Sequence, residues 1–204
     1  MIKRAFDVFM ASIAIVVLSP LMLVVAILVK LTMGGDVFFR QWRPGKGEAP
    51  FQVIKFRTMR EAVDKHGVLL PDEERVTRVG LMIRRASLDE LPQLFNILKG
   101  DMSFVGPRPL LMDYLPYFIG DERRRHDVRP GVTGLAQVSG RHDISWEKKL
   151  KLDVEYVDRH SLWLDLKILY ATFFIVLKRE GILYTAPQGR LDDYRRRLGL
   201  RHVA

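Results

Sequence analysis

The feature that most constrains this chain is an uncharged apolar run near its N-terminus. Residues 8–29 read VFMASIAIVVLSPLMLVVAILV, which is 22 residues without a charged side chain. A helix that crosses the hydrocarbon core of a membrane needs about 20 such residues. The run is too long for the apolar part of a signal peptide, and no cleavage pattern of small residues follows it. We therefore expect a membrane-associated helix at the start of the fold.

Ser19 and Pro20 interrupt the middle of this run. In a helix, Pro20 cannot donate a hydrogen bond to the Val16 carbonyl, and its ring crowds that carbonyl, so the helix must bend. The Ser19 hydroxyl can satisfy the carbonyl of Ile15 or Val16. A bent helix could enter one leaflet and return to the same face, whereas an ordinary kinked helix would span the bilayer. The residues alone leave both alternatives open.

Basic residues stand on both sides of the run, with Lys3 and Arg4 before it and Lys30 after it. Positive residues normally mark the cytoplasmic side of a span, so this symmetry gives a spanning helix no orientation. In the re-entrant alternative, all three side chains would meet one anionic surface.

The composition describes a basic protein of one domain. The chain has 204 residues, enough for one domain with its own core, and a net charge of +9. Such an excess of positive charge predicts an anionic partner, which nucleic acid, a phosphorylated metabolite or an anionic lipid would satisfy. The chain has no cysteine, which excludes disulfides and cysteine-bound zinc, and its five histidines show no metal-ligand spacing.

The remaining pattern predicts an α+β fold that is mainly helical with a small β-hairpin. The β-like runs 37–39 and 51–56 flank the turn-rich, basic segment RPGKGEAP, which is typical of a hairpin. A helix is expected to begin near 60, and others cover 79–86, 89–99, 111–127 (broken by Pro116), 146–159 and 162–179. The segments 101–110 and 129–141 are expected to be loops, and the basic tail 189–204 to be loosely held.

The predicted helix 162–179 contains the apolar stretch ILYATFFIVL. Its ten residues are too few to span a bilayer, so the helix suits either the core or the membrane interface.

The stretch SLDELP, residues 87–92, places two adjacent carboxylates, Asp89 and Glu90, in this basic protein. One interpretation is structural, because Ser87 and Glu90 form a capping-box pattern and Asp89 would complement the helix dipole. The other is chemical, since a helix N-terminus also binds phosphate and keeps a carboxylate ionised, as a nucleophile requires. The second carboxylate would then hold Mg²⁺ or handle a proton.

Several basic residues stand near this pair or in segments that could reach it. Arg84 and Arg85 precede it, and Arg108 follows between two prolines. Lys55 and Arg57 would share one face of a strand, and their simplest interpretation is a solvated face. Arg129 and Arg141 flank a glycine-rich loop. That loop could cradle a phosphate, or it could serve only as a connector.

Several blocks, taken in order, resemble the monotopic phosphoglycosyl transferases of the bacterial sugar transferase family. The blocks are KRAFD (3–7), LSP (18–20), VFFRQWRPG to KFRTM (37–59), SLDELPQLFNILKGDMSFVGPRPLL (87–111), RPGVTGLAQVSGR (129–141) and LDVEYV (152–157). The order of the blocks makes the match specific, although no single block would. The chain is similar to the small, catalytic-core members, such as those that start glycan assembly with a diacetamido sugar like bacillosamine.

The resemblance implies an enzyme for the first membrane step of bacterial glycan assembly. Such enzymes transfer a sugar 1-phosphate from a UDP-sugar to undecaprenyl phosphate, release UMP and use Mg²⁺. Carried over, Asp89 would be the nucleophile that forms a covalent phosphosugar intermediate, and Glu90 its partner in metal binding or in activating the acceptor phosphate. Phosphate and nucleotide contacts are expected from Lys55, Arg57, Arg85, Arg108, Arg129 and Arg141.

The resemblance also implies an organisation and a location. Ser19–Pro20 would be the break of a re-entrant helix in residues 1–33, followed by a catalytic domain over 34–185 with interfacial amphipathic helices and a basic tail over 186–204. We expect a monotopic protein of the bacterial inner membrane with its catalytic domain on the cytoplasmic face. Its partners would be anionic lipid and downstream glycosyltransferases, and no nucleic acid.

Three positions leave questions within this resemblance. Asp153 lies in a matching block, but the sequence assigns it no role. Leu135 and Ser139 depart from the family pattern, in which an aromatic residue and an asparagine are expected. Both lie in the glycine-rich loop, so nucleotide or sugar contacts there are in question.

Two rival hypotheses remain at this point. A membrane-bound phosphohydrolase would use the same aspartate with water as the acceptor, and would release sugar phosphate without lipid. A membrane-anchored nucleic-acid-binding module would use the arginines, but the aromatic residues lie mostly in apolar runs and not among the basic loops.

Overall fold

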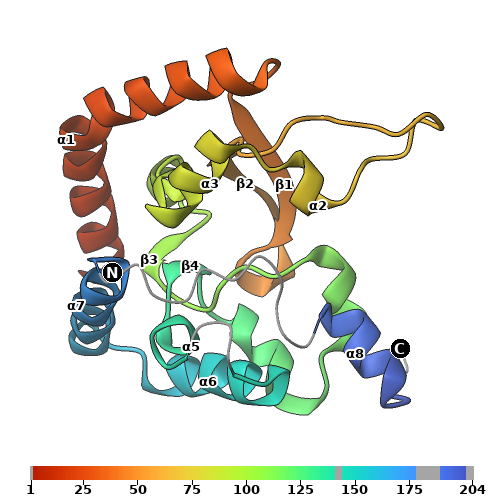
Figure 1. Ribbon diagram of the computed structural model, residues 1–204. Helices are drawn as coiled ribbons and strands as arrows, with labels where there is room; N and C mark the ends of the chain where they lie inside the picture. Colours follow the sequence, from red (N-terminus) through yellow and green to blue (C-terminus); the bar gives the residue numbers. More distant parts are fainter. Residues whose placement is uncertain (1, 141–143, 178–188, 201–204) are drawn as a thin grey trace.

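The computed structural model describes residues 2–140, 144–177 and 189–200. A long bent helix, α1, borders two sides of the molecule, and the hairpin and the helices within residues 78–99 pack against its inner side (Figure 1). The fold is mainly helical with a small two-stranded antiparallel sheet. The predicted α+β class is therefore confirmed.

The helix α1 covers Ile2–Met33 and is long and apolar enough to cross a membrane by length and composition. It bends in its middle, where Pro20 lies inside the helix (Figure 1). The Ser19 hydroxyl donates to the Val16 carbonyl at 2.8 Å, as the sequence predicted. The first arm packs Ala11 against the hairpin and α4 (Gln93–Lys99). The second arm packs Val25 and other residues against β2 (Pro50–Phe56) and α3 (Arg78–Arg85).

The start of α1 is joined to the rest of the protein by its charged residues. Lys3 Nζ contacts Asp165 Oδ2 at 2.5 Å, and Arg4 donates to the Ile97 and Leu98 carbonyls. Lys30, at the other end, donates to the Gly35 carbonyl. Lys3 and Arg4, which the re-entrant alternative directs to an anionic surface, therefore both have partners inside the protein, and both remain partly exposed.

The hairpin consists of β1 (Phe38–Pro44) and β2 (Pro50–Phe56), which pair antiparallel from Phe38–Phe56 to Pro44–Pro50. A short turn, η1 (Lys46–Glu48), joins them, and Gly47 takes a φ of 62° there. This left-handed conformation favours glycine. The hairpin is confirmed, and β1 extends further than its apolar run because Gln41 and Arg43 continue the ladder.

The segment after the hairpin differs from its prediction. The helix expected near 60 is absent from this described segment; the first helical residues are α2 (Asp72–Arg75), followed by α3 (Arg78–Arg85). The basic helix predicted over 79–86 is thus confirmed. The helix predicted over 89–99 is divided into the turn η2 (Leu88–Glu90) and α4 (Gln93–Lys99), because Pro92 takes the N-cap position. Gly100 ends α4 with a φ of 100°, as expected.

The two predicted loops each contain a short strand. β3 (Ser103–Val105) and β4 (Gly131–Thr133) pair in parallel, and α5 (Leu135–Val138) follows β4. A Cβ atom on Gly131 would lie 2.1 Å from the Gly106 nitrogen, so the two backbones approach too closely for any side chain. This close approach fixes the segment that carries Arg108 next to the glycine-rich loop.

The remaining helices cover the other side of the molecule. The segment predicted as a broken helix over 111–127 forms two 3₁₀ segments, η3 (Met112–Tyr117) and η4 (Gly120–His126). The helices α6 (Trp146–Arg159) and α7 (Leu162–Leu177) match their predictions within the described residues. The tail is not loose throughout, because α8 (Leu191–Arg197) packs Leu191 into the core beside η3. The boundary predicted at 185/186 lies outside the described residues.

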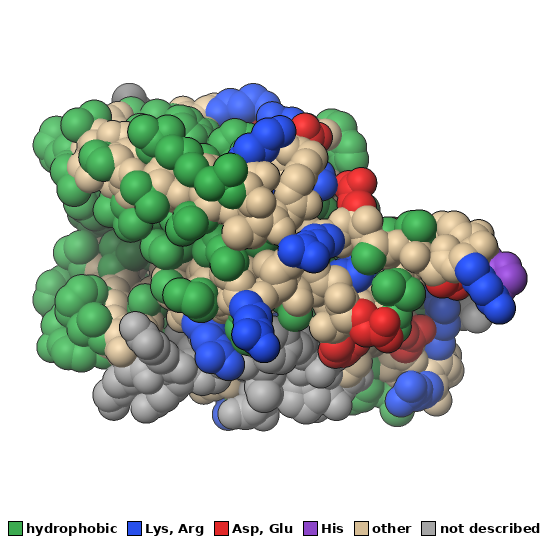
Figure 2. Space-filling model, turned by 45° about the horizontal axis from the view of Figure 1, so that its top comes forward, with side chains coloured by type: hydrophobic (Ala, Val, Ile, Leu, Met, Phe, Trp, Pro, Cys, Tyr) green, Lys and Arg blue, Asp and Glu red, His purple; other side chains and the backbone are tan. Residues whose placement is uncertain are grey.

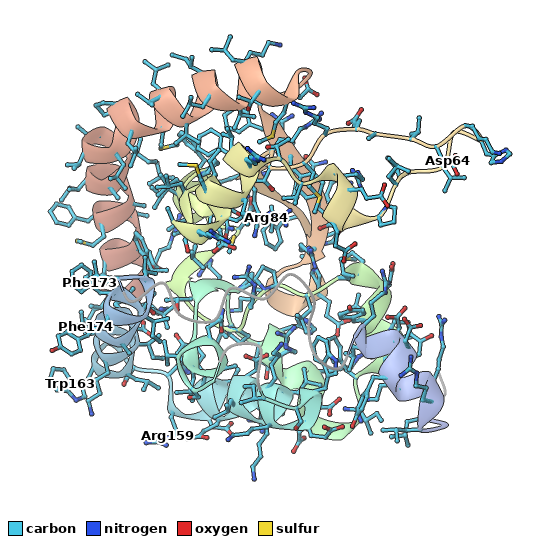
Figure 3. The ribbon with its side chains drawn as sticks, in the orientation of Figure 1. Asp64, Arg84, Arg159, Trp163, Phe173 and Phe174 are labelled. Carbon is cyan, nitrogen blue, oxygen red and sulfur yellow. The ribbon has the colours of Figure 1, made fainter. Side chains whose placement is uncertain are left out.

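One face of the molecule is strongly apolar. Hydrophobic side chains gather over the outer sides of α1 and α7 (Figure 2). Trp163, Phe173 and Phe174 of α7 point away from the body of the protein on the side that α1 also borders (Figure 3). Contiguous exposed apolar surface of this kind marks a contact with a membrane or a partner.

Candidate active site

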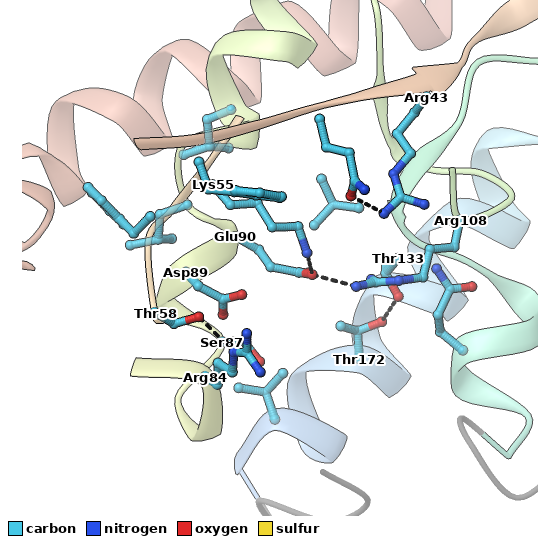
Figure 4. Close-up of a pocket in the computed structure, with 18 of the residues that line it drawn as sticks. Arg43, Lys55, Thr58, Arg84, Ser87, Asp89, Glu90, Arg108, Thr133 and Thr172 are labelled. Carbon is cyan, nitrogen blue, oxygen red and sulfur yellow. Dashed lines mark hydrogen bonds and ion pairs between the residues drawn. The ribbon is translucent and has the colours of Figure 1, made fainter. Parts of the chain in front are cut away.

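A cavity of about 760 Å³ lies between the hairpin, the turn η2 and the helices α5 to α7. Its wall combines residues from both halves of the chain, and the carboxylates of the SLDELP stretch face it (Figure 4). Most of the cationic residues predicted from the sequence also border it, so the structure brings the main predicted groups together.

The turn η2 directs Asp89 and Glu90 into this cavity. Ser87 precedes the turn with a φ of 54°, a left-handed conformation that is unfavourable for a residue with a side chain. Its side chain forms no capping hydrogen bond, and Glu90 points to the cavity instead of back to Ser87. The capping-box interpretation is therefore wrong, because Glu90 is bound by cations from two other segments.

Glu90 is held by Lys55 from β2 and Arg108 from the segment after β3. Lys55 Nζ and Arg108 Nη2 each lie 2.6 Å from the same oxygen, Glu90 Oε1 (Figure 4). Burial acts to raise the pKa of Glu90, but the charges of Arg108 and Lys55 outweigh it and hold the pKa well below its usual range. Glu90 is thus a permanently ionised carboxylate whose other oxygen is free of these two contacts.

Asp89 has no hydrogen bond or ion pair with any of the described residues. Burial, and then the adjacent charge of Glu90, raise the pKa of Asp89 against the opposing effect of Lys55, Arg108 and Arg84, and the net result is a pKa of about 6. The carboxylate therefore remains mostly ionised at neutral pH but is poorly neutralised by the protein. A negative oxygen of this kind is available to a cation or to an electrophile.

The two arginines before the turn have different positions. Arg84 donates to Thr58 Oγ1 at 2.7 Å and lines the cavity. Arg85 ends α3, is exposed and does not line the cavity. Arg57 lines the cavity and pairs with Glu61 at 3.2 Å. Of the predicted phosphate ligands, Arg85 therefore lies away from the cavity, because it is exposed at the end of α3, whereas its neighbour Arg84 lines the cavity (Figure 4).

Of the other two predicted arginines, one is described by the structure and does not line the cavity. Arg129 donates to the Gly100 carbonyl at 2.8 Å and does not line it, so its observed contact is structural. Arg141 lies outside the described residues.

A buried ion pair supports Arg108 from behind. Arg125 of η4 contacts Asp153 of α6 at 2.7 Å, with side-chain exposures of 1 % and 3 %. Arg125 also donates to the backbone carbonyl of Arg108 at 2.8 Å. Asp153, which the sequence left without a role, thus holds the group that positions the Arg108 segment.

Sequence reasoning missed several residues of the cavity wall. Arg43 of β1 borders it; burial, and then the charge of Arg108, lower the pKa of Arg43 to about 10. Lys149 of α6 and Gln137 of α5 border it as well. Alternation along the hairpin could have placed Arg43 on the same face as Lys55. No motif marks Lys149, and only its position in the RPGVTGLAQVSGR block singled out Gln137.

The carboxylate pair fits the coordination habits of magnesium. Mg²⁺ is commonly held by one or two carboxylates together with substrate phosphates. Asp89 offers two unpaired oxygens, and both cation contacts of Glu90 go to Oε1. Among the described residues, no group of three carboxylates or histidines gathers at one point, so the phosphates of a bound substrate would have to complete such a site.

The part of the cavity wall formed by α1 and α7 is apolar. It is formed by Ala14 and Leu18 of α1 and by Val176 of α7, with Leu94 and Phe104 between them. Thr133 and Thr172 join the glycine-rich loop to α7 through a 2.7 Å hydrogen bond at this side. The cavity therefore combines a charged region with a region suited to a hydrocarbon chain.

Curated sugar transferases are similar to this chain over most of its length. The chain is 54 % identical over 184 residues to the uncharacterized sugar transferase EpsL of Bacillus subtilis, covering 90 % of this chain and 91 % of the relative. It is 43 % identical over 180 residues to a UDP-glucose:undecaprenyl-phosphate glucose-1-phosphate transferase of Caulobacter vibrioides (83 % and 67 %). It is 44 % identical over 188 residues to a UDP-N-acetylgalactosamine-undecaprenyl-phosphate N-acetylgalactosaminephosphotransferase of Aeromonas hydrophila (88 % and 44 %).

The family model named bacterial sugar transferase matches residues 1–179, which include α1, the hairpin and every described residue of the cavity. The match extends over far more than half of the chain, and the relatives agree with it. The chain therefore belongs to the bacterial sugar transferase family.

Proposed function

We propose that the protein transfers a sugar 1-phosphate from a UDP-sugar to undecaprenyl phosphate and releases UMP, through a covalent intermediate on Asp89. The observation that carries the proposal is the contrast within the carboxylate pair: Glu90 is bound by two cations, whereas Asp89 is unpaired and faces the cavity. The names of the relatives from Caulobacter vibrioides and Aeromonas hydrophila support the two substrates.

In the first step, an Asp89 oxygen attacks the β-phosphorus of the UDP-sugar. A new bond forms between this oxygen and phosphorus while the bond from the phosphorus to the bridging oxygen of the diphosphate breaks. The bridging oxygen takes the electron pair and leaves with UMP. Arg84 and Arg108 border the cavity around Asp89 and would spread the negative charge of the transferring group.

In the second step, a phosphate oxygen of the lipid acceptor attacks the phosphorus of the intermediate. The bond between phosphorus and the Asp89 oxygen breaks, which restores the carboxylate and leaves the sugar diphosphate on the lipid. Glu90 stays ionised throughout, because Lys55 and Arg108 hold its charge. This favours a role for Glu90 in cation binding and positioning over a role as proton donor.

Asp89 and Glu90 are the residues that would hold Mg²⁺, which would neutralise the phosphate charges of the donor during transfer. The apolar wall around Leu18 and Val176 would receive the first part of the isoprenoid chain.

The bend at Pro20 and the shared apolar face of α1 and α7 support a re-entrant, monotopic arrangement at the inner membrane. In this arrangement α7 lies in the interface and the cavity opens on the cytoplasmic side. Because the chain has no cysteine, Ala5→Cys and Leu31→Cys provide clean single labelling sites on exposed residues at the two ends of α1. Both should react from the same membrane face; reaction from opposite faces would contradict the re-entrant arrangement.

The decisive test of the reaction is intact-protein mass spectrometry of the full chain in nanodiscs, mixed with a panel of UDP-sugars and Mg²⁺ without acceptor. With the correct donor, we expect the mass of one sugar phosphate to be added to Asp89 and UMP to be released. Asp89→Asn should show no addition, whereas Asp158→Asn, which changes an exposed aspartate paired with Arg124, should behave as the wild type.

Adding undecaprenyl phosphate should then remove the adduct and form the lipid-linked sugar diphosphate. Release of free sugar phosphate at full rate without lipid would instead indicate a phosphohydrolase. Unchanged turnover in Asp89→Asn would refute the covalent mechanism.

A further inference from the structure

The side chain of Gln137 has an unusual environment. It lies on α5, beside the cavity, and both its amide oxygen and its amide nitrogen are shielded from solvent without a hydrogen-bond partner. A buried polar group without a hydrogen-bond partner destabilises the folded state, and folded proteins contain few of them. An orphan donor and an orphan acceptor on one side chain at a cavity wall therefore point to a ligand that supplies both partners.

The local backbone is shaped around this amide. A Cβ atom on Gly134 would lie 2.9 Å from Gln137 Oε1 and 2.2 Å from the Gly106 carbonyl oxygen. Gly134 thus leaves the space in which the amide rests, and the hydrogen bond between Thr133 and Thr172 closes the wall beside it. Among the described residues, none offers a hydrogen bond to this amide, which rests against Gly134 at the cavity wall.

We propose that Gln137 recognises an amide-type edge of the sugar nucleotide, meaning an N–H donor next to a carbonyl acceptor; this rests on the function proposed above. Gln137 Oε1 accepts from the ligand N–H while Nε2 donates to the ligand carbonyl, and the two bonds form a cyclic pair. Glutamine makes paired bonds of this kind with the edges of nucleobases. Gln137 is then a specificity-determining residue for the donor.

Two parts of a UDP-sugar carry an N–H donor and a carbonyl acceptor. In the imide of uracil the two lie side by side, so both bonds can form. In the acetamido group of an N-acetylated sugar they point in opposite directions, so that group can satisfy only one atom of the Gln137 amide at a time. The two parts can be separated because uracil leaves with UMP after the first step, whereas the sugar stays on Asp89 until the acceptor removes it. A contact to uracil affects only the formation of the intermediate, and a contact to the acetamido group affects both steps.

The test compares the full-length wild type, Gln137→Leu and the matched control Gln52→Leu in nanodiscs. Gln52 lies on β2, outside the residues that line the cavity, so the control makes the same chemical change away from the ligand. Adduct formation is measured with the donor that labels the wild type best. Transfer to undecaprenyl phosphate is measured separately, from adduct formed at saturating donor and freed of nucleotide.

If Gln137 binds uracil, Gln137→Leu should raise the KM for the donor roughly 10- to 100-fold, as expected for two lost hydrogen bonds. The transfer step should keep its wild-type rate. A 3-methyluridine form of the donor, which lacks the N–H, should be equally poor for wild type and variant. This last measurement on the wild type needs no altered protein, so it stands even where the variant fails to fold.

If Gln137 binds the acetamido group, both steps should slow in Gln137→Leu, and the difference from wild type should vanish for the matching donor with a 2-hydroxyl group. The inference is overturned if Gln137→Leu matches Gln52→Leu in both steps, or if the wild type accepts the 3-methyl and the 2-hydroxyl donors as well as the parent compound. If the wild type forms neither adduct nor product with any UDP-sugar, the proposed function is overturned as well. If the wild type is active but Gln137→Leu behaves like the control, only the Gln137 contact is refuted.

Discussion

The Asp89–Glu90 turn and the Arg125–Asp153 pair both border the same cavity. They differ in whether each carboxylate has a counter-charge. Arg125 and Asp153 are almost fully buried and neutralise each other at 2.7 Å. In the turn, two cations converge on Glu90 and leave Asp89 without a partner. The difference teaches that packing can leave one carboxylate beside the cavity without a counter-charge, as the proposed nucleophile requires, while it neutralises another that has a structural role.

The largest effect should come from removing the unpaired carboxylate. Asp89→Asn keeps the size of the side chain but removes the nucleophilic oxygen, so turnover should fall by about 10³-fold or more. UMP release with the correct donor measures this loss. If Asp89→Asn folded normally and kept more than a tenth of the wild-type turnover, the proposed contrast between Asp89 and the structural carboxylate Asp153 would be contradicted.

Asp153→Asn should instead act mainly on stability. It leaves Arg125 buried without its counter-charge, which typically costs about 3–5 kcal/mol. Chemical denaturation in detergent, followed by tryptophan fluorescence, measures the free energy of unfolding. Asp158→Asn, which breaks an exposed pair, serves as the control and should change it by less than about 1 kcal/mol.

A double variant, Arg125→Met with Asp153→Leu, sharpens this point. Apolar replacements of a buried pair often restore stability. Activity should nevertheless stay low, because the Arg125 hydrogen bond to the Arg108 carbonyl is lost. Full recovery of turnover together with stability would contradict a positioning role for the pair.

The next effect concerns Arg108, which contacts both Glu90 of the turn and, through its backbone carbonyl, Arg125 of the buried pair. Arg108→Lys keeps a positive charge near Glu90 but loses the planar guanidinium, so turnover should fall roughly 10- to 100-fold. The side chain is 45 % exposed, so stability should change little. The matched control is Arg124→Lys at the exposed pair with Asp158, which should retain wild-type turnover.

The elements of the fold and of the site that could be predicted are those that the local sequence determines. The hairpin, α3 and α6 follow from apolar spacing and turn residues, and Pro20 with Ser19 gave the bend of α1. The role of Glu90 did not follow, because the SLDE pattern satisfies a capping box locally while Lys55 and Arg108 arrive from distant segments. Likewise, the choice between Arg84 and Arg85 depends on the rotation of a short helix, which adjacent arginines do not encode.

The smallest effect should be a pH dependence of stability that belongs to Asp89. Its pKa in the folded protein is raised to about 6, above the value of an unfolded aspartate, so ionisation disfavours the folded state. Wild-type stability should therefore fall as pH rises from about 4 to 6, relative to Asp89→Asn. Thermal unfolding without Mg²⁺ at several pH values measures this difference, and a constant gap between the two proteins would refute it.

The way α1 is built into the protein has a practical consequence for anyone seeking a water-soluble form. Ala11, Val25 and Val29 of α1 are core residues, and Ala14 and Leu18 line the cavity. Deleting the helix would remove part of the enzyme along with its anchor. Repolarising only its outward positions, such as Val16, Val17 and Leu31, is the route that preserves the interior.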